Sequence, residues 1–313
     1  MKVFLFVLLS ILLVLLVSGA YTFAVACIRR KELPWFEEAE LKKTSFGKYY
    51  PYIIMTDQWL KEHNAQDVFM MSEDGLKLHA YWVPAEDPKG TIILAHGYRS
   101  TLLVDFSRAF DSYHKKGLNI LAPQQRAHGE SEGKYITFGV KESEDFRLWI
   151  EYHNAHFGPH PLILSGMSMG ASTVLYLADQ NLPENVKGII ADCGFTSPKE
   201  IIAKVFQNII HLPAWICMWS VDLFARIFAG FSLSQKNTKK ALANSRLPVL
   251  LVHGKADDFV PCSMTEAGYA ICTSPKTMFL VEGAGHGVSY IVAKDEYSKH
   301  IDRFLHEVME DYF

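Results

Sequence analysis

The pattern of apolar and polar positions divides the chain into two unlike parts. From Val3 to Cys27 no charge interrupts the apolar run, and about 25 such residues can cross a bilayer as a tilted helix. After it, short apolar runs alternate with stretches in which apolar residues recur at helical spacing. The pattern predicts an N-terminal transmembrane helix over 1–31, a linker and helical lead-in over 32–66, and one globular domain over 67–313.

A cleaved signal peptide is the alternative for the first segment. Small residues suited to cleavage occur at Ser18-Gly19-Ala20 and Ala24-Val25-Ala26. The length of the run and the basic Arg29-Arg30-Lys31 directly after it favour a retained single-pass anchor. Positive charge is heavier after the run than before it, so the positive-inside rule favours a cytoplasmic domain. An exported or secreted domain is the competing localisation.

Short apolar runs within 67–313 predict the strands of one sheet. Residues 67–71 and 76–83, joined through Glu73-Asp74-Gly75, indicate an antiparallel hairpin. Runs without polar alternation, which are typical of buried parallel strands, follow near 91–95, 118–122, 161–165, 187–192, 248–252 and 277–281. The helical stretches between them imply right-handed crossovers with helices on both faces. The domain is therefore predicted to be an α/β protein with a mostly parallel central sheet.

Composition and the absence of certain motifs argue against several classes of binding site. The 313 residues are 49% hydrophobic and 21% charged with a net charge of −3, so the chain can bury a large core and offers no basic field to nucleic acid. The five cysteines contain no C-x-x-C pair, which indicates neither a metal site nor a redox motif. Phosphate-loop and dinucleotide-binding patterns are absent from the sequence. No cofactor, metal or nucleic-acid partner is expected.

One pentapeptide places a serine on a sharp turn. Gly166-Met167-Ser168-Met169-Gly170 follows an apolar strand and precedes a helical stretch. On such a strand–turn–helix the serine is strained and its hydroxyl is exposed above the sheet, while the glycines remove side chains that would collide. The pattern predicts a nucleophile at Ser168, with a helix N-cap as the alternative.

An acid and a histidine follow beyond the carboxyl ends of later strands. Asp257 lies after the run 248–252, and His286 lies in a glycine-rich loop after the run 277–281. Open α/β sheets place their chemistry at this edge. The order nucleophile, acid, histidine is that of the α/β hydrolases. Asp258 competes with Asp257 for the role of the acid.

Four motifs together carry a family resemblance: His96-Gly97-Tyr98, Arg126 to Ser131, Gly166 to Gly170, and His253 to Pro261. With them, residues Asp67 to Phe313 resemble the α/β-hydrolase superfamily, most closely the serine aminopeptidase and monoacylglycerol-lipase-like group of bacterial hydrolases. At Gln124, two positions before Arg126, this family often has an aspartate. The hydrogen bonding within this loop is therefore expected to differ from that of the family.

The resemblance implies a role for each site residue. It selects Asp257 over Asp258 as the carboxylate that orients the general base His286, and it implies an oxyanion hole from the backbone N–H groups of Met169 and Tyr98. The expected reaction is cleavage of a carboxylic ester, lipid-like in one version, through an acyl-enzyme on Ser168. Alternatives are acyl transfer or peptide cleavage on the same triad, or a membrane-tethered binding protein without activity.

A long insertion at about 197–245 occupies the place where this fold carries a lid. Its apolar residues recur at helical spacing and include Trp215 and Trp219. These tryptophans are expected to form a hydrophobic acyl-binding wall, which beside a membrane anchor would suit lipid-like substrates. Packing of the lid onto the body is the alternative.

Overall fold

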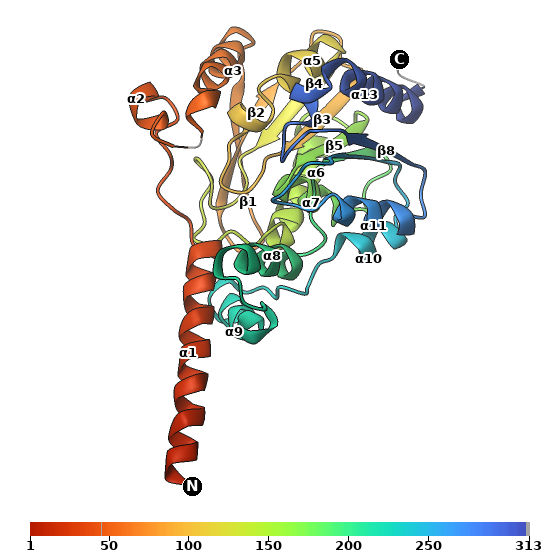
Figure 1. Cartoon of the computed structure of the whole chain (residues 1–313). Coiled ribbons are helices and arrows are strands. Elements are labelled where there is room, and N and C mark those ends of the chain that lie inside the picture. The colour runs from red at the N-terminus through yellow and green to blue at the C-terminus, as the bar shows by residue number, and fades with distance from the viewer. Residues whose placement is uncertain (45, 311–313) are drawn as a thin grey trace.

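A central sheet organises the computed structural model, which describes residues 1–44 and 46–310. Its eight strands lie in the order β1-β2-β4-β3-β5-β6-β7-β8 (Figure 1). They are β1 (Gln66–Met71), β2 (Lys77–Val83), β3 (Gly90–Ala95), β4 (Leu118–Pro123), β5 (Leu162–Met167), β6 (Val186–Asp192), β7 (Val249–Gly254) and β8 (Lys276–Val281). The β1–β2 and β2–β4 pairs are antiparallel, and all other pairs are parallel. The predicted hairpin and mostly parallel sheet are confirmed.

Helices cover both faces of the sheet (Figure 1). They are α1 (Lys2–Cys27), α2 (Glu38–Leu41), α3 (Tyr50–Glu62), α4 (Leu102–Asp105), α5 (Ala109–Lys115), α6 (Val140–His156), α7 (Met169–Leu175), α8 (Pro198–Ile210), α9 (Trp215–Phe224), α10 (Thr238–Ala243), α11 (Ser263–Ile271), α12 (Ser289–Val292) and α13 (Lys294–Val308), with a 3₁₀ turn η1 (Gly47–Tyr49) and a π-helical turn η2 (Ala225–Ala229).

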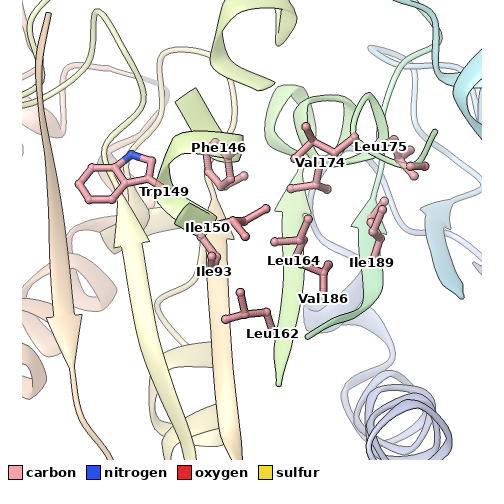
Figure 2. Packing of buried hydrophobic residues seen from close by; sticks show 14 of the residues in the cluster. Ile93, Phe146, Trp149, Ile150, Leu162, Leu164, Val174, Leu175, Val186 and Ile189 are labelled. Carbon is pink, nitrogen blue, oxygen red and sulfur yellow. The ribbon is translucent and has the colours of Figure 1, made fainter. Parts of the chain in front are cut away.

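The strands are buried on both sides because neighbouring residues enter different cores. Ile93 and Leu164 pack with α6 and α7 on one face, as Figure 2 shows for Phe146, Trp149 and Ile150. Residues one position away along the same strands, such as Ile92, pack against α3, α5 and α13 on the other face. This double burial explains why the strands appear in the sequence as apolar runs without alternation.

The helix α1 leaves the body of the molecule as a long rod (Figure 1). Within the described residues, it is the one helix long and apolar enough to cross a membrane. Its first half is exposed, and its buried residues are Gly19, Phe23 and Cys27 near the carboxyl end. The coarse prediction of an N-terminal apolar helix that could be an anchor or a signal sequence therefore holds.

The insertion 197–245 contains α8, α9, η2 and α10. Its buried residues, among them Met218 and Val221 of α9, form a third core with Phe23 and Cys27 of α1 and with Phe138 of the loop before α6. The insertion therefore joins the membrane-helix candidate to the sheet domain.

Candidate active site

A strained turn holds Ser168 between β5 and α7. Its backbone has φ 54° and ψ −115°, a region that side chains other than glycine rarely adopt. The Ser168 N–H donates to the Asp192 carbonyl at 2.8 Å. A Cβ on Gly166 would lie 2.2 Å from the Gly170 oxygen, and one on Gly170 would lie 1.9 Å from the Ala95 oxygen. Only glycine fits at both positions, so the motif is dictated by close packing of the turn.

The structure brings Ser168, His286 and Asp257 into one hydrogen-bonded row. His286 Nε2 lies 2.9 Å from Ser168 Oγ, and His286 Nδ1 lies 2.7 Å from Asp257 Oδ2. A carboxylate can only accept, so Nδ1 carries the proton and Nε2 is left to accept from the serine hydroxyl. Three residues from three different loops thus adopt the geometry that activates a nucleophile.

The hydrogen bonds around Asp257 favour its ionised form. Its Oδ1 accepts the backbone N–H groups of Phe259 and Val260 at 3.0 and 2.8 Å. Burial raises the pKa of this carboxyl, but hydrogen bonds from His253 and His286 outweigh burial and hold the pKa well below its usual range. The neighbouring Asp258 is exposed, so the structure brings Asp257 and not Asp258 to the histidine.

Two backbone amides beside Ser168 are free to donate. Gly97 lies against the serine, since a Cβ built on it would be 3.4 Å from Ser168 Cβ. The N–H groups of Tyr98, directly after Gly97, and of Met169, the first residue of α7, donate to no acceptor among the described residues. Both N–H groups are therefore available to donate to a substrate oxygen bound beside Ser168.

Sequence reasoning missed Asp105, whose carboxylate accepts hydrogen bonds from the loop that contains Gly97 and Tyr98. The Gly97 N–H donates to its Oδ2 at 2.6 Å, and Ser100 Oγ donates to its Oδ1 at 2.7 Å. Burial raises the pKa of Asp105 to about 6 against the effect of these hydrogen bonds. A charged residue within the apolar stretch 102–106 was the one available signal.

Two neutral histidines support the same loop. The N–H groups of Gln125 and Arg99 donate to the Nε2 atoms of His96 and His128, each at 3.0 Å. Burial lowers the pKa of His96 to about 3 and that of His128 to about 4, so both rings stay neutral acceptors. At the position that departs from the family, Gln124 Oε1 accepts the Glu130 N–H at 2.6 Å.

A cavity of about 260 Å³ opens beside Ser168 and His286. Its walls come from η1 and α3, from the segment α4–α5, and from α12–α13. The large side chains include Phe46, Tyr49, Tyr52, Tyr113, Tyr290, Ile291 and Tyr297. The walls therefore derive from the lead-in and the C-terminal helices, which the sequence pattern had not singled out.

The structure does not bring Trp215 and Trp219 to this cavity, whose described lining contains neither. Both tryptophans belong to α9 and are exposed, by 78% and 44%. The helix packs instead against α1, where Ser220 Oγ donates to the Leu15 carbonyl at 2.9 Å. The buried face of α9 carries Cys217, Ser220 and Val221, so the apolar stripe with Trp215 and Trp219 is not the face that packs onto the body.

The last turn of α1 reaches the loop that carries the free Tyr98 amide. The Tyr98 hydroxyl donates to the Ala26 carbonyl at 2.8 Å, and the Arg99 guanidinium donates to the Val25 carbonyl at 2.7 Å. The Ile136 N–H donates to the Cys27 carbonyl at 2.7 Å. These contacts satisfy carbonyls that the end of a helix leaves unpaired.

The donor atoms of Cys193, Asp257 and His286 lie within 4.8 Å of one another, close enough to hold a metal ion. The chemistry is unfavourable, because burial raises the pKa of the Cys193 thiol well above its ordinary value. Both ring nitrogens of His286 already have partners in Ser168 and Asp257. We therefore assign no metal to this group.

Comparison with known proteins gives the same fold. Residues 86–221 match the family described as "Serine aminopeptidase, S33". The chain is similar to the uncharacterized protein YqkD of Bacillus subtilis (strain 168), with 29% identity over 232 residues that cover 74% of this chain and 76% of YqkD. It is also similar to the uncharacterized protein YfhR of Escherichia coli (strain K12), with 24% identity over 247 residues, 76% of this chain and 78% of YfhR.

Among solved structures, the esterase Pf2001 of Pyrococcus furiosus has a TM-score of 0.66 and 24% identity, and the match covers 80% of this chain and 94% of Pf2001. The esterase EaEST from Exiguobacterium antarcticum has a TM-score of 0.57 and 17% identity over 76% of this chain and 99% of EaEST. The sheet order and the structural neighbours show that the chain has the α/β-hydrolase fold, and residues 86–221 are similar to the serine aminopeptidase family.

Proposed function

We propose that the protein is a membrane-anchored serine hydrolase that cleaves carboxylic esters through an acyl-enzyme. The observation that carries the proposal is the continuous row from Ser168 through His286 to Asp257 beside a cavity. A serine hydroxyl is a weak nucleophile, and a base at hydrogen-bond distance with its own orienting carboxylate is what activates it.

In the proposed reaction, His286 Nε2 takes the proton of Ser168 as Oγ attacks the ester carbonyl. The oxyanion that forms accepts hydrogen bonds from the N–H groups of Met169 and Tyr98. The ionised Asp257 stabilises the imidazolium, which then protonates the departing alcohol oxygen. Water, deprotonated by the same histidine, attacks the acyl-enzyme and releases the acid.

The cavity supports a small or medium-sized neutral ester as substrate. Its volume of about 260 Å³ lies just below the range of most ligand cavities, which span roughly 300–1,000 Å³. The acidic side chain in the described lining, Asp105, already accepts from Gly97 and Ser100, which leaves it poorly placed to hold a free amino terminus. This favours an ester over a peptide, and two of the structural neighbours are named esterases.

A retained anchor is proposed over a cleaved signal peptide. Phe23 and Cys27 are 4% and 0% exposed in a core shared with the catalytic domain. Cleavage after Ala26 would remove Phe23 and the carbonyl that accepts from Tyr98, and cleavage after Ala20 would remove Gly19, which lies against Ser220. The basic residues after the helix favour a cytoplasmic catalytic domain.

A fluorophosphonate probe tests the activated serine. Folded, full-length protein in detergent should be labelled, the Ser168→Ala variant should not, and Ser298→Ala, a serine of the cavity wall, should be labelled like the wild type. A panel of esters graded by acyl length would then define the substrate class. No labelling of folded wild type would contradict the proposal and favour a binding protein on a hydrolase scaffold.

A further inference from the structure

A row of exposed apolar side chains at helical spacing extends from the turn before α9 through η2. We call it the apolar ridge, and it consists of Leu212, Trp215, Trp219, Leu223, Ile227 and Phe228, whose side chains are between 39% and 78% exposed. Exposed apolar residues scattered singly are ordinary, but a contiguous row of large ones marks a surface that is covered by a partner or a membrane. The active-site cavity does not use the ridge, because none of these residues lines its described walls.

The helix α9 packs against α1, and the two lie side by side in Figure 1. Besides the hydrogen bond from Ser220 to Leu15, a Cβ on Gly19 would lie 2.0 Å from Ser220 Oγ, so the two helices touch at this glycine. Further along, the Phe23 ring lies 6.5 and 6.1 Å from the rings of Phe224 and Phe228. The contact therefore extends over the stretch of α1 from Leu15 to Phe23.

The length of α1 that precedes its contact with α9 determines how deep the apolar ridge lies in a bilayer. The apolar run begins after the charged Lys2, so Val3–Val14, about 12 residues or roughly 18 Å of helix, precede the contact with α9. The hydrocarbon core of a bilayer is roughly 30 Å thick. If α1 spans this core, residues beyond Val14 must also lie within it. Because α9 packs against those residues, α9 then lies at the same depth.

We propose that α9 and η2 are embedded beside α1 in the leaflet next to the catalytic domain, with the apolar ridge in contact with lipid acyl chains. If the span occupies about 20 residues from Val3, Leu15 lies roughly 10–12 Å below the near boundary of the hydrocarbon region. Phe23, at the other end of the contact, lies at that boundary, so α9 and η2 extend from the interface, where amphipathic helices lie and tryptophan is enriched, into the upper hydrocarbon region. The inference rests on the proposed anchor and is independent of the reaction.

The polar groups of α9 and η2 are satisfied in a way that suits lipid. Trp219 Nε1 donates to the Ile216 carbonyl at 3.1 Å. Asp222 accepts from Arg226 Nε and from the Leu233 N–H, both at 2.7 Å. Pairing within the segment lowers the cost of bringing these groups close to hydrocarbon.

Quenching of tryptophan fluorescence by brominated lipid tests this placement. Full-length protein would be reconstituted into phosphatidylcholine vesicles with ordinary or dibrominated acyl chains. Bromine in the upper part of the chains should quench the wild-type emission, and most of that decrease should be lost in the Trp215→Phe/Trp219→Phe variant, which keeps the ridge apolar. Trp59→Phe, on α3, is the control and should leave the decrease unchanged.

Flotation of the vesicles after alkaline carbonate treatment separates the possible failures. Protein that does not float would overturn both the anchor and the ridge proposal. Protein that floats but whose quenching does not depend on Trp215 and Trp219 would overturn the ridge proposal alone. In that case, disulfide-linked dimers of an Ile227→Cys variant would identify a second copy as the partner of the ridge. Probe labelling of Ser168 reports on the hydrolase proposal separately.

Discussion

The strained backbone at Ser168 predicts that two substitutions of this proposed nucleophile will have different effects on stability. Ser168 has φ 54° and ψ −115°, and the close approach of Gly97 leaves the turn little freedom to relax. Ser168→Ala keeps the Cβ and therefore keeps the strain. Ser168→Gly removes the Cβ, so the same turn becomes an allowed conformation.

The magnitude follows from two opposing contributions. A residue held in a sparsely populated backbone region costs about 1–3 kcal/mol. Glycine lowers the stability of the folded state by about 0.4–1 kcal/mol, because it makes the unfolded chain more flexible. Ser168→Gly should therefore be more stable than Ser168→Ala by about 0.5–2 kcal/mol, or a few degrees in Tm for a domain of this size. Both variants lose the same hydrogen bond to His286, which cancels in the comparison.

The assay is thermal unfolding of both variants in one detergent, followed by near-ultraviolet circular dichroism, with probe labelling as the activity readout. Labelling should be absent from both variants, because both lack the hydroxyl of the proposed nucleophile. A Ser168→Gly protein no more stable than Ser168→Ala would refute the reasoning, because it would mean that the turn stores no strain.

Three further substitutions test other contacts. Asp105→Asn should change the dependence of stability on pH: burial raises the folded-state pKa of Asp105 to about 6 from 3.8, so between pH 4 and pH 7 the stability of the wild type should fall by about 3 kcal/mol relative to that of the variant; parallel denaturation profiles would contradict this. Tyr98→Phe removes the hydrogen bond to Ala26, and since such a bond contributes about 1 kcal/mol, kcat on a short-chain ester should fall several-fold with probe labelling retained; unchanged kcat would show that the contact is dispensable. Gly170→Ala would place a Cβ 1.9 Å from the Ala95 oxygen and should lower Tm sharply or abolish folding, whereas normal folding would show that the turn can move.

The sheet and the row of three polar residues were accessible from the sequence because their signals are local. Strands buried on both faces appear as apolar runs, and the loops after β7 and β8 place Asp257 and His286 at one edge by topology alone. Ser168 was marked by glycines whose need is steric, as the clash distances at Gly166 and Gly170 show. Each of these inferences required only the chain near the residue and the rule for parallel sheets.

The features that sequence reasoning missed depend on contacts between distant segments. Asp105 shows no periodicity, and its importance comes from the Gly97 N–H that it receives. The cavity combines Tyr49 from the lead-in with Tyr290 from the C-terminal region. The apolar stripe that contains Trp215 and Trp219 is exposed, because α1 packs against another face of α9 at Ser220, and spacing along one helix does not show which face is covered.

The contacts of Ala26 and Cys27 impose an order on biogenesis. These residues leave the ribosome early, whereas their partners Tyr98 and Ile136 are synthesised later, and N-terminal segments are the first to settle during translation. The sheet domain must therefore finish folding against a helix whose position has already been decided. If α1 is a membrane anchor, a chain whose first helix is not inserted would lack the contacts of Ala26 and Cys27 with Tyr98 and Ile136, so the proposed site would be complete only in inserted molecules.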